Sequence, residues 1–295
     1  MSDRASRRRA TAIGFIAILL WALLALFTVG SAPVPPFQLN AMCFALGGLA
    51  GVVWLVRTGG AARLKAVPLP VYLFGTAGLF GYHALYFGAL RLAPPAEAGL
   101  IAYLWPLLIV LFSGLLPGER LKAGHLLGAL AGFAGAALII GGGLGQGGGA
   151  GAGYALALAC ALTWSGYSVL SRRLGTIPTE SVVVFCLATA ALSLPLHLMV
   201  EDTAWPEGTI GWAAVAGLGL GPVGLAFYVW DHGVKHGDIQ LLGVASYAAP
   251  LLSTLVLVLT GLAPAGWQLA LAALLITGGA ALAARASFRA TDQGI

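Results

Sequence analysis

Apolar residues fill long stretches of this 295-residue chain, and polar residues are confined to the short gaps between them. Each stretch is about 20 residues long, the length that a helix needs to cross the hydrocarbon core of a bilayer. Strands of a membrane barrel would instead alternate polar and apolar residues over about 10 positions. We therefore predict an all-α membrane protein with ten transmembrane helices, near residues 10–30, 37–57, 67–91, 94–116, 123–142, 153–172, 178–200, 209–235, 238–260 and 266–286.

The composition agrees with this class. Hydrophobic residues make up 59% of the chain and charged residues only 8%, whereas an average soluble domain carries about 25% charged residues. The first stretch follows a basic leader, as a signal peptide does. Its apolar run is longer than a usual signal core and more apolar stretches follow, so we expect it to be retained as a helix.

The lysines and arginines predict an orientation. Loops on the cytoplasmic side of a membrane protein hold an excess of both residues. If the N-terminus is cytoplasmic, 14 of the 15 basic residues face the cytoplasm and only Arg91 lies outside. We therefore expect both termini in the cytoplasm. The net charge of +5 then reflects topology, and no nucleic-acid partner is expected.

Two prolines interrupt similar apolar stretches. The segments "AYLWPLL" at 102–108 and "SYAAPLL" at 246–252 share the pattern Tyr-x-x-Pro-Leu-Leu, 144 residues apart. A proline inside a helix removes one backbone hydrogen bond and frees the carbonyl four residues earlier. Within a membrane, a free carbonyl is tolerated beside a wet cavity or a polar neighbour. We expect Pro106 and Pro250 to be hinges beside a central cavity; a structural kink in a packed bundle is the alternative.

The prolines belong to a longer internal repeat. At the same offset Tyr86 aligns with Trp230, and Arg91 aligns with Lys235. Because each predicted repeat has five helices, an odd number, the second repeat enters the membrane inverted. Inverted repeats around a central cavity are a transporter architecture. The predicted parts are a first five-helix repeat at 1–142, a glycine-rich periplasmic linker at 143–152 and a second, inverted five-helix repeat at 153–295.

Aromatic and polar side chains deep in the stretches are candidates for the cavity wall. Tyr82, His83 and Tyr86 share one helix face, although a histidine bonded to a tyrosine in a packed interior is the alternative. An aromatic pocket with a few polar tips suits a flat, amphipathic, largely apolar solute. The predicted substrate-binding residues are Tyr82, His83, Tyr86, Tyr103, Trp105, Trp164, Tyr167, Trp21, Trp230, Ser246 and Tyr247.

The segment "WDHGVKHGD" at 230–238 concentrates polar residues near the cytoplasmic end of the eighth stretch. His232 and His236 are four residues apart, a spacing that can chelate a metal on a helix. The alternative, which we favour, is a corner or cytoplasmic gate formed by Asp231, His232 and His236, with no metal. In that arrangement Asp231 pairs with Lys235, and Asp238 caps the next helix.

The remaining polar residues predict no reaction chemistry. No Asp or Glu falls at the middle of a predicted span, which favours facilitated diffusion, or coupling through His83, over a carboxylate proton relay. We find no nucleophile with a matched base and no phosphate-binding loop. We therefore expect neither an enzyme nor a cofactor. Glu119 is expected to pair with Arg120 or Lys122.

Several segments carry a family resemblance. "ALTWSGYSVLSRRL" at 161–174 and "LLPGERL" at 115–121 resemble the EamA-type branch of the drug/metabolite transporter (DMT) superfamily. "AYLWPLL" and "HGDIQLLGVASYAAPLLS", at 236–253, resemble the YddG aromatic amino acid exporters of bacterial inner membranes. In that subfamily an asparagine usually precedes "YLWP", where this chain has Ala102.

The resemblance implies export of aromatic and other apolar amino acids by alternating access through a central cavity. It places Tyr82, His83, Tyr103, Trp105 and Trp164 on the cavity wall. The expected partners are the amino acid substrate and the lipid bilayer, and a monomer is compatible with this expectation. The alternative is a carrier of the same fold for divalent metals, drugs or other small metabolites.

Overall fold

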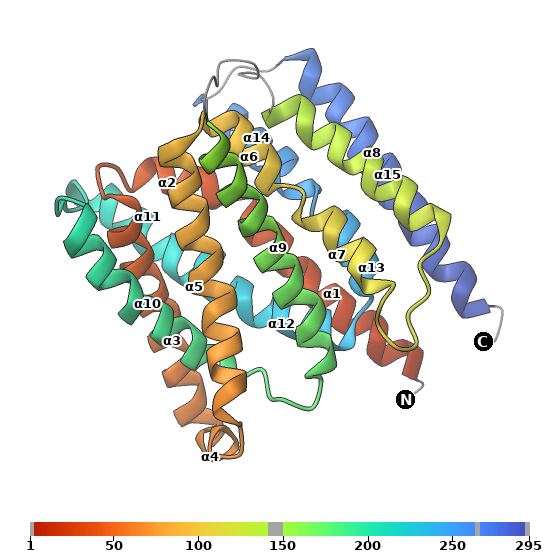
Figure 1. The fold of residues 1–295 in the computed structure, drawn as a ribbon, viewed down its shortest axis with the longest axis horizontal. Coiled ribbons are helices and arrows are strands. Elements are labelled where there is room, and N and C mark those ends of the chain that lie inside the picture. The colour runs from red at the N-terminus through yellow and green to blue at the C-terminus, as the bar shows by residue number, and fades with distance from the viewer. Residues whose placement is uncertain (1–2, 141–149, 263–265, 293–295) are drawn as a thin grey trace.

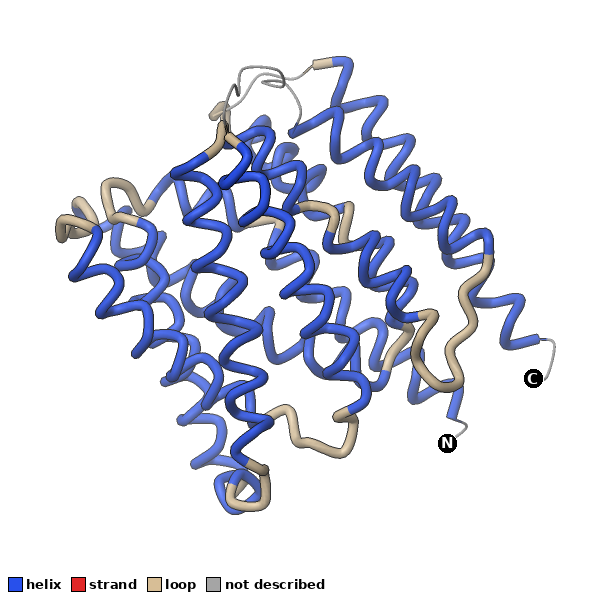
Figure 2. The backbone as a smooth tube through the Cα atoms, viewed as in Figure 1, coloured by secondary structure: helices blue, strands red, loops and turns tan. Residues whose placement is uncertain are grey.

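The structure is a computed structural model that describes residues 3–140, 150–262 and 266–292. Within these ranges it consists of helices and connecting turns, without strands (Figure 2). The helices of the first half are α1 (Asp3–Trp21), α2 (Leu24–Gly30), α3 (Pro36–Thr58), α4 (Ala61–Leu64), α5 (Leu69–Leu92), α6 (Pro95–Ala102), α7 (Trp105–Ser113) and α8 (Ala123–Ile140). Those of the second half are α9 (Gly151–Arg173), α10 (Ser181–Val200), α11 (Gly208–Leu220), the π-helical turn η1 (Gly221–Leu225), α12 (Ala226–His236), α13 (Ile239–Ala245), α14 (Ala248–Leu259) and α15 (Trp267–Asp292).

Many of these helical runs are long and apolar enough to cross a membrane. Among the described residues seven runs meet both criteria, and two shorter apolar helices cover Glu97–Ser113 and Ala123–Leu138. The seven runs are Arg4–Gly30, Pro36–Thr58, Gly151–Arg173, Ser181–Val200, Gly208–His236, Ile239–Leu259 and Trp267–Ser287. The predicted class, an all-helical membrane protein, is confirmed.

Helices from the two halves of the chain lie side by side. α1 packs along α12, α3 along α10, α5 along α9, α7 along α13 and α8 along α15. Some of these pairs approach closely because glycines face each other. A Cβ atom on Gly128 of α8, for example, would lie only 2.5 Å from the carbonyl oxygen of Gly279 on α15. α1 begins and α15 ends at the same end of the bundle (Figure 1).

Four of the apolar runs are broken near their middle. The break between α6 and α7 falls at Tyr103–Leu104, and the break between α13 and α14 falls at Ser246–Tyr247. Each precedes its proline by a few residues, because the proline ring displaces the carbonyl four positions earlier. The breaks at Ala22–Leu23 and at η1 were not predicted. They touch each other, since the indole Nε1 of Trp21 donates to the Pro222 carbonyl at 3.1 Å.

Candidate substrate cavity

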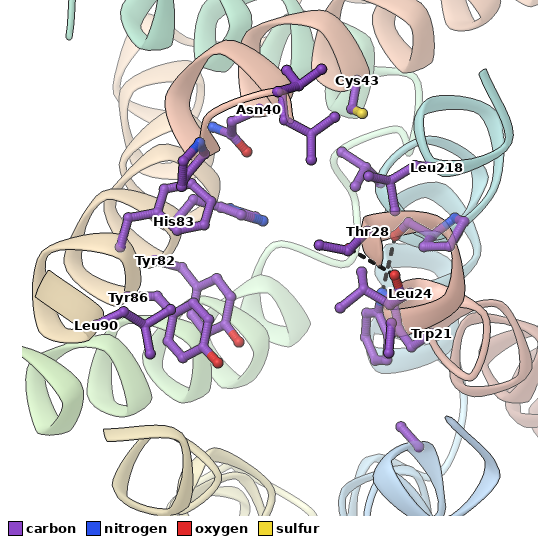
Figure 3. A pocket seen from close by; sticks show the side chains of 18 of the residues that line it. Trp21, Leu24, Thr28, Asn40, Cys43, Tyr82, His83, Tyr86, Leu90 and Leu218 are labelled. Atoms are coloured by element: carbon purple, nitrogen blue, oxygen red, sulfur yellow. Dashed lines mark hydrogen bonds between the residues drawn. The ribbon is translucent and has the colours of Figure 1, made fainter. Parts of the chain in front are cut away.

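A cavity of about 580 Å³ lies among the broken helices, within the usual range for small-molecule sites. The side chains around it come mainly from α2, α3, α5 and the segment that contains η1 (Figure 3). No Asp, Glu, Lys or Arg is among the described residues that line it. Seven of the eleven predicted substrate-binding residues line it, namely Trp21, Tyr82, His83, Tyr86, Tyr103, Trp105 and Trp164.

Four tryptophans from four different segments meet at one end of the cavity. The ring of Trp21 lies 6.0 Å from Trp105, 6.1 Å from Trp164 and 5.1 Å from Trp230, measured between centroids. Trp105 and Trp164 meet edge to face at 6.3 Å. Edge-to-face contacts are favourable for aromatic rings. The tryptophan cluster, Trp21, Trp105, Trp164 and Trp230, therefore forms a packed wall between the cavity and the end of the bundle where α1 begins.

Four predicted residues lie outside the cavity lining. Trp230 is the fully buried member of the tryptophan cluster, and its Nε1 donates to the Ser168 hydroxyl at 3.1 Å. Tyr167 stacks between Phe74 and Trp164. The buried Ser246 hydroxyl donates to the Leu242 carbonyl of its own helix at 2.7 Å. Tyr247 is fully buried, and its hydroxyl accepts the Leu107 backbone N–H at 3.1 Å. In this conformation these four residues therefore pack against protein groups or hydrogen-bond to them, and none of them lines the cavity.

Asn40 lines the cavity and was missed in the sequence. It is one of two side-chain amides in α3, with Gln38, and a polar residue inside a membrane helix is a signal for a functional site. Its Nδ2 donates to the Ser193 hydroxyl on α10 at 2.7 Å, and Ser193 in turn donates to the Thr189 carbonyl at 2.8 Å. Asn40 is thus held by the neighbouring helix and faces the cavity (Figure 3).

The predicted corner after α12 is stabilised by a buried ion pair. The Lys235 ammonium lies 2.8 Å from the Asp231 carboxylate, which also accepts the Thr179 hydroxyl at 2.8 Å. The Asp238 carboxylate accepts the Leu241 N–H at the start of α13. The predicted pair and cap are both confirmed. The rings of His232 and His236 lie 5.0 Å apart, and the described residues contain no group of three or more potential metal ligands.

A second ionic cluster closes the same end of the bundle. Glu119 pairs with Arg172 and with Arg7, the latter at 3.2 Å. The expectation that it pairs with its sequence neighbours was therefore wrong. The turn after α7 carries Glu119 inward to a position between α1 and α9, where its side chain is 7% exposed. Arg172 also donates to the Val234 and Gly237 carbonyls at the end of α12, at 2.9 and 2.8 Å.

The opposite end of the bundle has its own buried carboxylate. Glu201, after α10, accepts the N–H groups of Phe37 and Gln38 at 3.0 to 3.1 Å. These are the first free N–H groups of α3, so the carboxylate also stabilises the helix dipole. Arg91, from α5, donates to the same carboxylate at 3.0 Å. Residues of the nearby α2–α3 loop, including Pro33, line the cavity, which therefore extends toward this end.

These features define a class of protein. A helical membrane bundle holds an uncharged, aromatic cavity between its two halves, and the cavity extends toward one end while ion pairs and tryptophans close the other. This arrangement is typical of a transporter.

The comparisons with known proteins give the family. The EamA-like transporter family matches residues 9–141 and, a second time, residues 151–285. The chain therefore belongs to the EamA-like transporter family, and it is a multi-pass membrane transporter. The family resemblance noted in the sequence is confirmed.

Named relatives cover almost the whole chain. The aromatic amino acid exporter YddG of Ancylobacter novellus is 56% identical over 281 residues, which cover 94% of this chain and 98% of that protein. The aromatic amino acid exporter YddG of Escherichia coli K12 is 28% identical over 292 residues, covering 94% and 97%. A crystal structure of a protein with 56% sequence identity has a TM-score of 0.90 and covers 94% of this chain and 98% of its own.

Proposed function

We propose that this chain exports aromatic and other apolar amino acids across a bacterial inner membrane. The observation that carries the proposal is the uncharged cavity between the two halves, with a tryptophan wall and three tyrosines. Indole and phenyl side chains pack well against such rings. A zwitterion brings no net charge, so it needs no buried counter-ion. The relatives named as aromatic amino acid exporters support the same substrate class.

The proposed topology has ten crossings in two inverted repeats, residues 1–142 and 153–295. The helix pairs support it when each broken helix is counted as one segment. The ten segments are numbered along the chain, and a twofold axis exchanges segment n with segment n+5. This axis exchanges the pair 1–8 with the pair 6–3. It maps each of the pairs 2–7, 4–9 and 5–10 onto itself. Both termini are proposed to be cytoplasmic. The proposed periplasmic linker at 143–152 falls mostly on residues 143–149, which lie outside the described residues.

With that orientation, the cavity of this conformation faces the periplasm. The cytoplasmic end is closed by the tryptophan cluster and by the ion pairs of Glu119 with Arg7 and Arg172. We propose that the halves of two broken segments swing about Pro106 and Pro250, which opens the cytoplasmic end and closes the other.

The corner of Asp231, His232 and His236 lies at the closed cytoplasmic end and is proposed as part of the gate. The Asp231–Lys235 pair fastens α12 to the turn before α10, because Lys235 also donates to the Ile177 carbonyl at 3.1 Å. Arg172 reaches the end of the same helix. Opening this side therefore requires α9, α12 and the Glu119 turn to separate.

Reconstituted transport tests the function directly. Liposomes that hold the purified protein are expected to take up labelled tryptophan and phenylalanine in a saturable manner. The cavity lining contains no carboxylate, so uptake is expected to be independent of an imposed pH gradient. Gradient-dependent uptake would assign coupling to His83. Correctly folded protein that transports no amino acid would contradict the proposal, and uptake of divalent metals or other metabolites would then identify a different carrier of this fold.

A further inference from the structure

The cavity holds two kinds of polar group, neutral acceptors and hydroxyls that can donate, and this difference can orient a substrate. Resting on the proposed function, we infer that Asn40 and His83 bind the ammonium group of the amino acid, and that the hydroxyls of Tyr82, Tyr86 and Tyr103 bind its carboxylate.

The amide of Asn40 has a fixed orientation. Ser193 has one hydroxyl proton, and that proton is donated to the Thr189 carbonyl at 2.8 Å. The Ser193 oxygen must therefore accept from Asn40, so the atom that faces it at 2.7 Å is the amide nitrogen. The Oδ1 atom is left to the cavity that Asn40 lines. A carboxamide oxygen accepts hydrogen bonds and cannot donate one.

The ring of His83 is fixed in the same way. Its Nδ1 lies 2.7 Å from the Leu79 carbonyl, and a carbonyl only accepts, so Nδ1 carries the proton. In a neutral imidazole the other nitrogen is then an acceptor. No described residue supplies a hydrogen-bond partner for Nε2, and the ring borders the cavity. The edges of Phe44 and Phe227 surround it at 5.0 and 6.1 Å.

The two acceptors lie close together. Phe44, which contacts His83, is one helical turn from Asn40 on α3, so Asn40 and His83 face the same part of the cavity. Figure 3 shows the two side chains next to each other on one wall. An ammonium group carries three donors and no acceptor. Two neutral acceptors, Asn40 Oδ1 and His83 Nε2, therefore match it, while the Nδ1–H of His83 and one of the two N–H groups of Asn40 are already donated within the protein.

The three tyrosines supply the opposite kind of group. No described residue accepts a hydrogen bond from the hydroxyls of Tyr82, Tyr86 or Tyr103, although all three line the cavity. The rings of Tyr82 and Tyr86 are parallel at 6.3 Å, and their hydroxyls point the same way in Figure 3. Hydroxyl donors that converge without a protein acceptor fit a carboxylate.

The two sites are neighbours, as an α-amino acid requires. The ammonium and carboxylate are attached to one carbon, so their receptors must be neighbours. The rings of Tyr82 and His83 are 5.1 Å apart. Trp21, Leu24 and Leu218 lie on the facing wall (Figure 3), where an apolar side chain can pack. The substrate would thus lie across the cavity, with its charged groups toward α3 and α5.

Competition with two half-ligands tests the assignment. Tryptamine keeps the ammonium group of tryptophan and lacks the carboxylate, and indole-3-propionate keeps the carboxylate and lacks the ammonium. Each competes with uptake of labelled tryptophan into liposomes. In Asn40→Leu and His83→Phe, the apparent affinity for tryptamine is expected to fall about 10-fold, while that for indole-3-propionate is unchanged. In Tyr86→Phe and Tyr103→Phe, the larger loss is expected for indole-3-propionate.

The ratio of the two affinities within one variant does not depend on how much of the protein has folded. Asn40→Asp adds a second test, because a carboxylate in that place should favour tryptamine over indole-3-propionate. The matched control is Tyr72→Phe, which removes a hydroxyl that donates to the Leu64 carbonyl and does not line the cavity. Its ratio should equal that of the wild type.

Two failures remain distinct. Equal losses for both half-ligands in Asn40→Leu and His83→Phe, or no loss in either variant, would overturn the assignment while wild-type uptake of tryptophan upholds the exporter. Wild-type protein that takes up no amino acid would overturn the proposed function and the assignment together.

Discussion

Two of the four broken segments, α6–α7 and α13–α14, share a backbone pattern but use it differently. Each has a tyrosine at its break and a proline three residues later. Tyr103 lines the cavity, and no described residue bonds its hydroxyl. Tyr247 is fully buried, and its hydroxyl accepts the Leu107 N–H beside the first break at 3.1 Å. The tyrosine at the second break thus supplies an acceptor for a backbone N–H beside the first break.

The residue before each proline differs as well. Trp105 and Ala249 occupy equivalent positions of the repeat, and both border the cavity. The indole of Trp105 fills its side of the cavity, whereas the small side chain of Ala249 leaves its side open. The repeated positions therefore determine where the helices break, whereas the positions that differ between the repeats shape the cavity. Substitutions that make one segment resemble the other test this division.

The largest effect is expected for Trp105→Ala, which gives the first break the residue of the second. Trp105 contacts Trp21, Trp164 and Trp230 and forms part of the cavity wall. Burial of a large apolar side chain contributes about 1.5–3 kcal/mol, so the apparent affinity for tryptophan should fall about 10- to 100-fold. Concentration-dependent uptake measures it. Trp205→Ala, on an exposed tryptophan, is the control, and equal affinity in both variants would contradict the assignment of Trp105.

Replacing the prolines tests whether both breaks act as hinges. An alanine at Pro106 or Pro250 restores a backbone N–H and lets the helix continue through the break. We expect each substitution to slow transport roughly 10-fold, which corresponds to about 1.4 kcal/mol added to the barrier. Initial uptake rates measure this. Wild-type rates in both Pro106→Ala and Pro250→Ala would disprove the hinges, and a loss in only one would assign the motion to that segment.

Removing the two tyrosine hydroxyls separates their roles. Tyr247→Phe leaves the Leu107 N–H without its acceptor, which should lower the free energy of unfolding by about 1–3 kcal/mol. Tyr103→Phe breaks no hydrogen bond within the described residues, so its stability should match the wild type while ligand selectivity changes. Thermal unfolding of both proteins in detergent makes the comparison. Equal stability would show that the Leu107 N–H finds another partner.

The contrast between the shared breaks and the differing side-chain partners also explains how much of this site the sequence predicts. Backbone breaks are visible in the sequence because proline acts locally, and aromatic residues deep in apolar runs mark a cavity. The partner of a side chain is not local. Glu119 pairs with Arg7 and Arg172, more than 50 residues away in the chain, and not with its neighbours. Ten apolar stretches also gave no sign that Asn40 would meet Ser193 on another helix.

The depth of a residue within an apolar run also does not predict which way its side chain points. Trp164 and Tyr167 lie one turn apart on α9, yet only Trp164 reaches the cavity. The glycine opposite decides the outcome for Tyr167, because a Cβ atom on Gly78 would lie 2.5 Å from its ring. The ring occupies the space that this glycine leaves on α5. Such a fit depends on how two helices meet, which the pattern of one helix does not contain.

The smallest effect is expected for Ser246→Ala, which gives the second break the residue that the first has at Ala102. Within the described part of the chain, the Ser246 hydroxyl bonds only the Leu242 carbonyl, and that carbonyl also accepts the Ser246 backbone N–H at 3.0 Å. Loss of the hydroxyl leaves no group unpaired, so the stability should change by about 1 kcal/mol or less. Tryptophan uptake should match the wild type. A strong loss of uptake with normal stability would mean that Ser246 contacts the substrate when the cavity opens to the other side, and the two breaks would then take turns at the substrate.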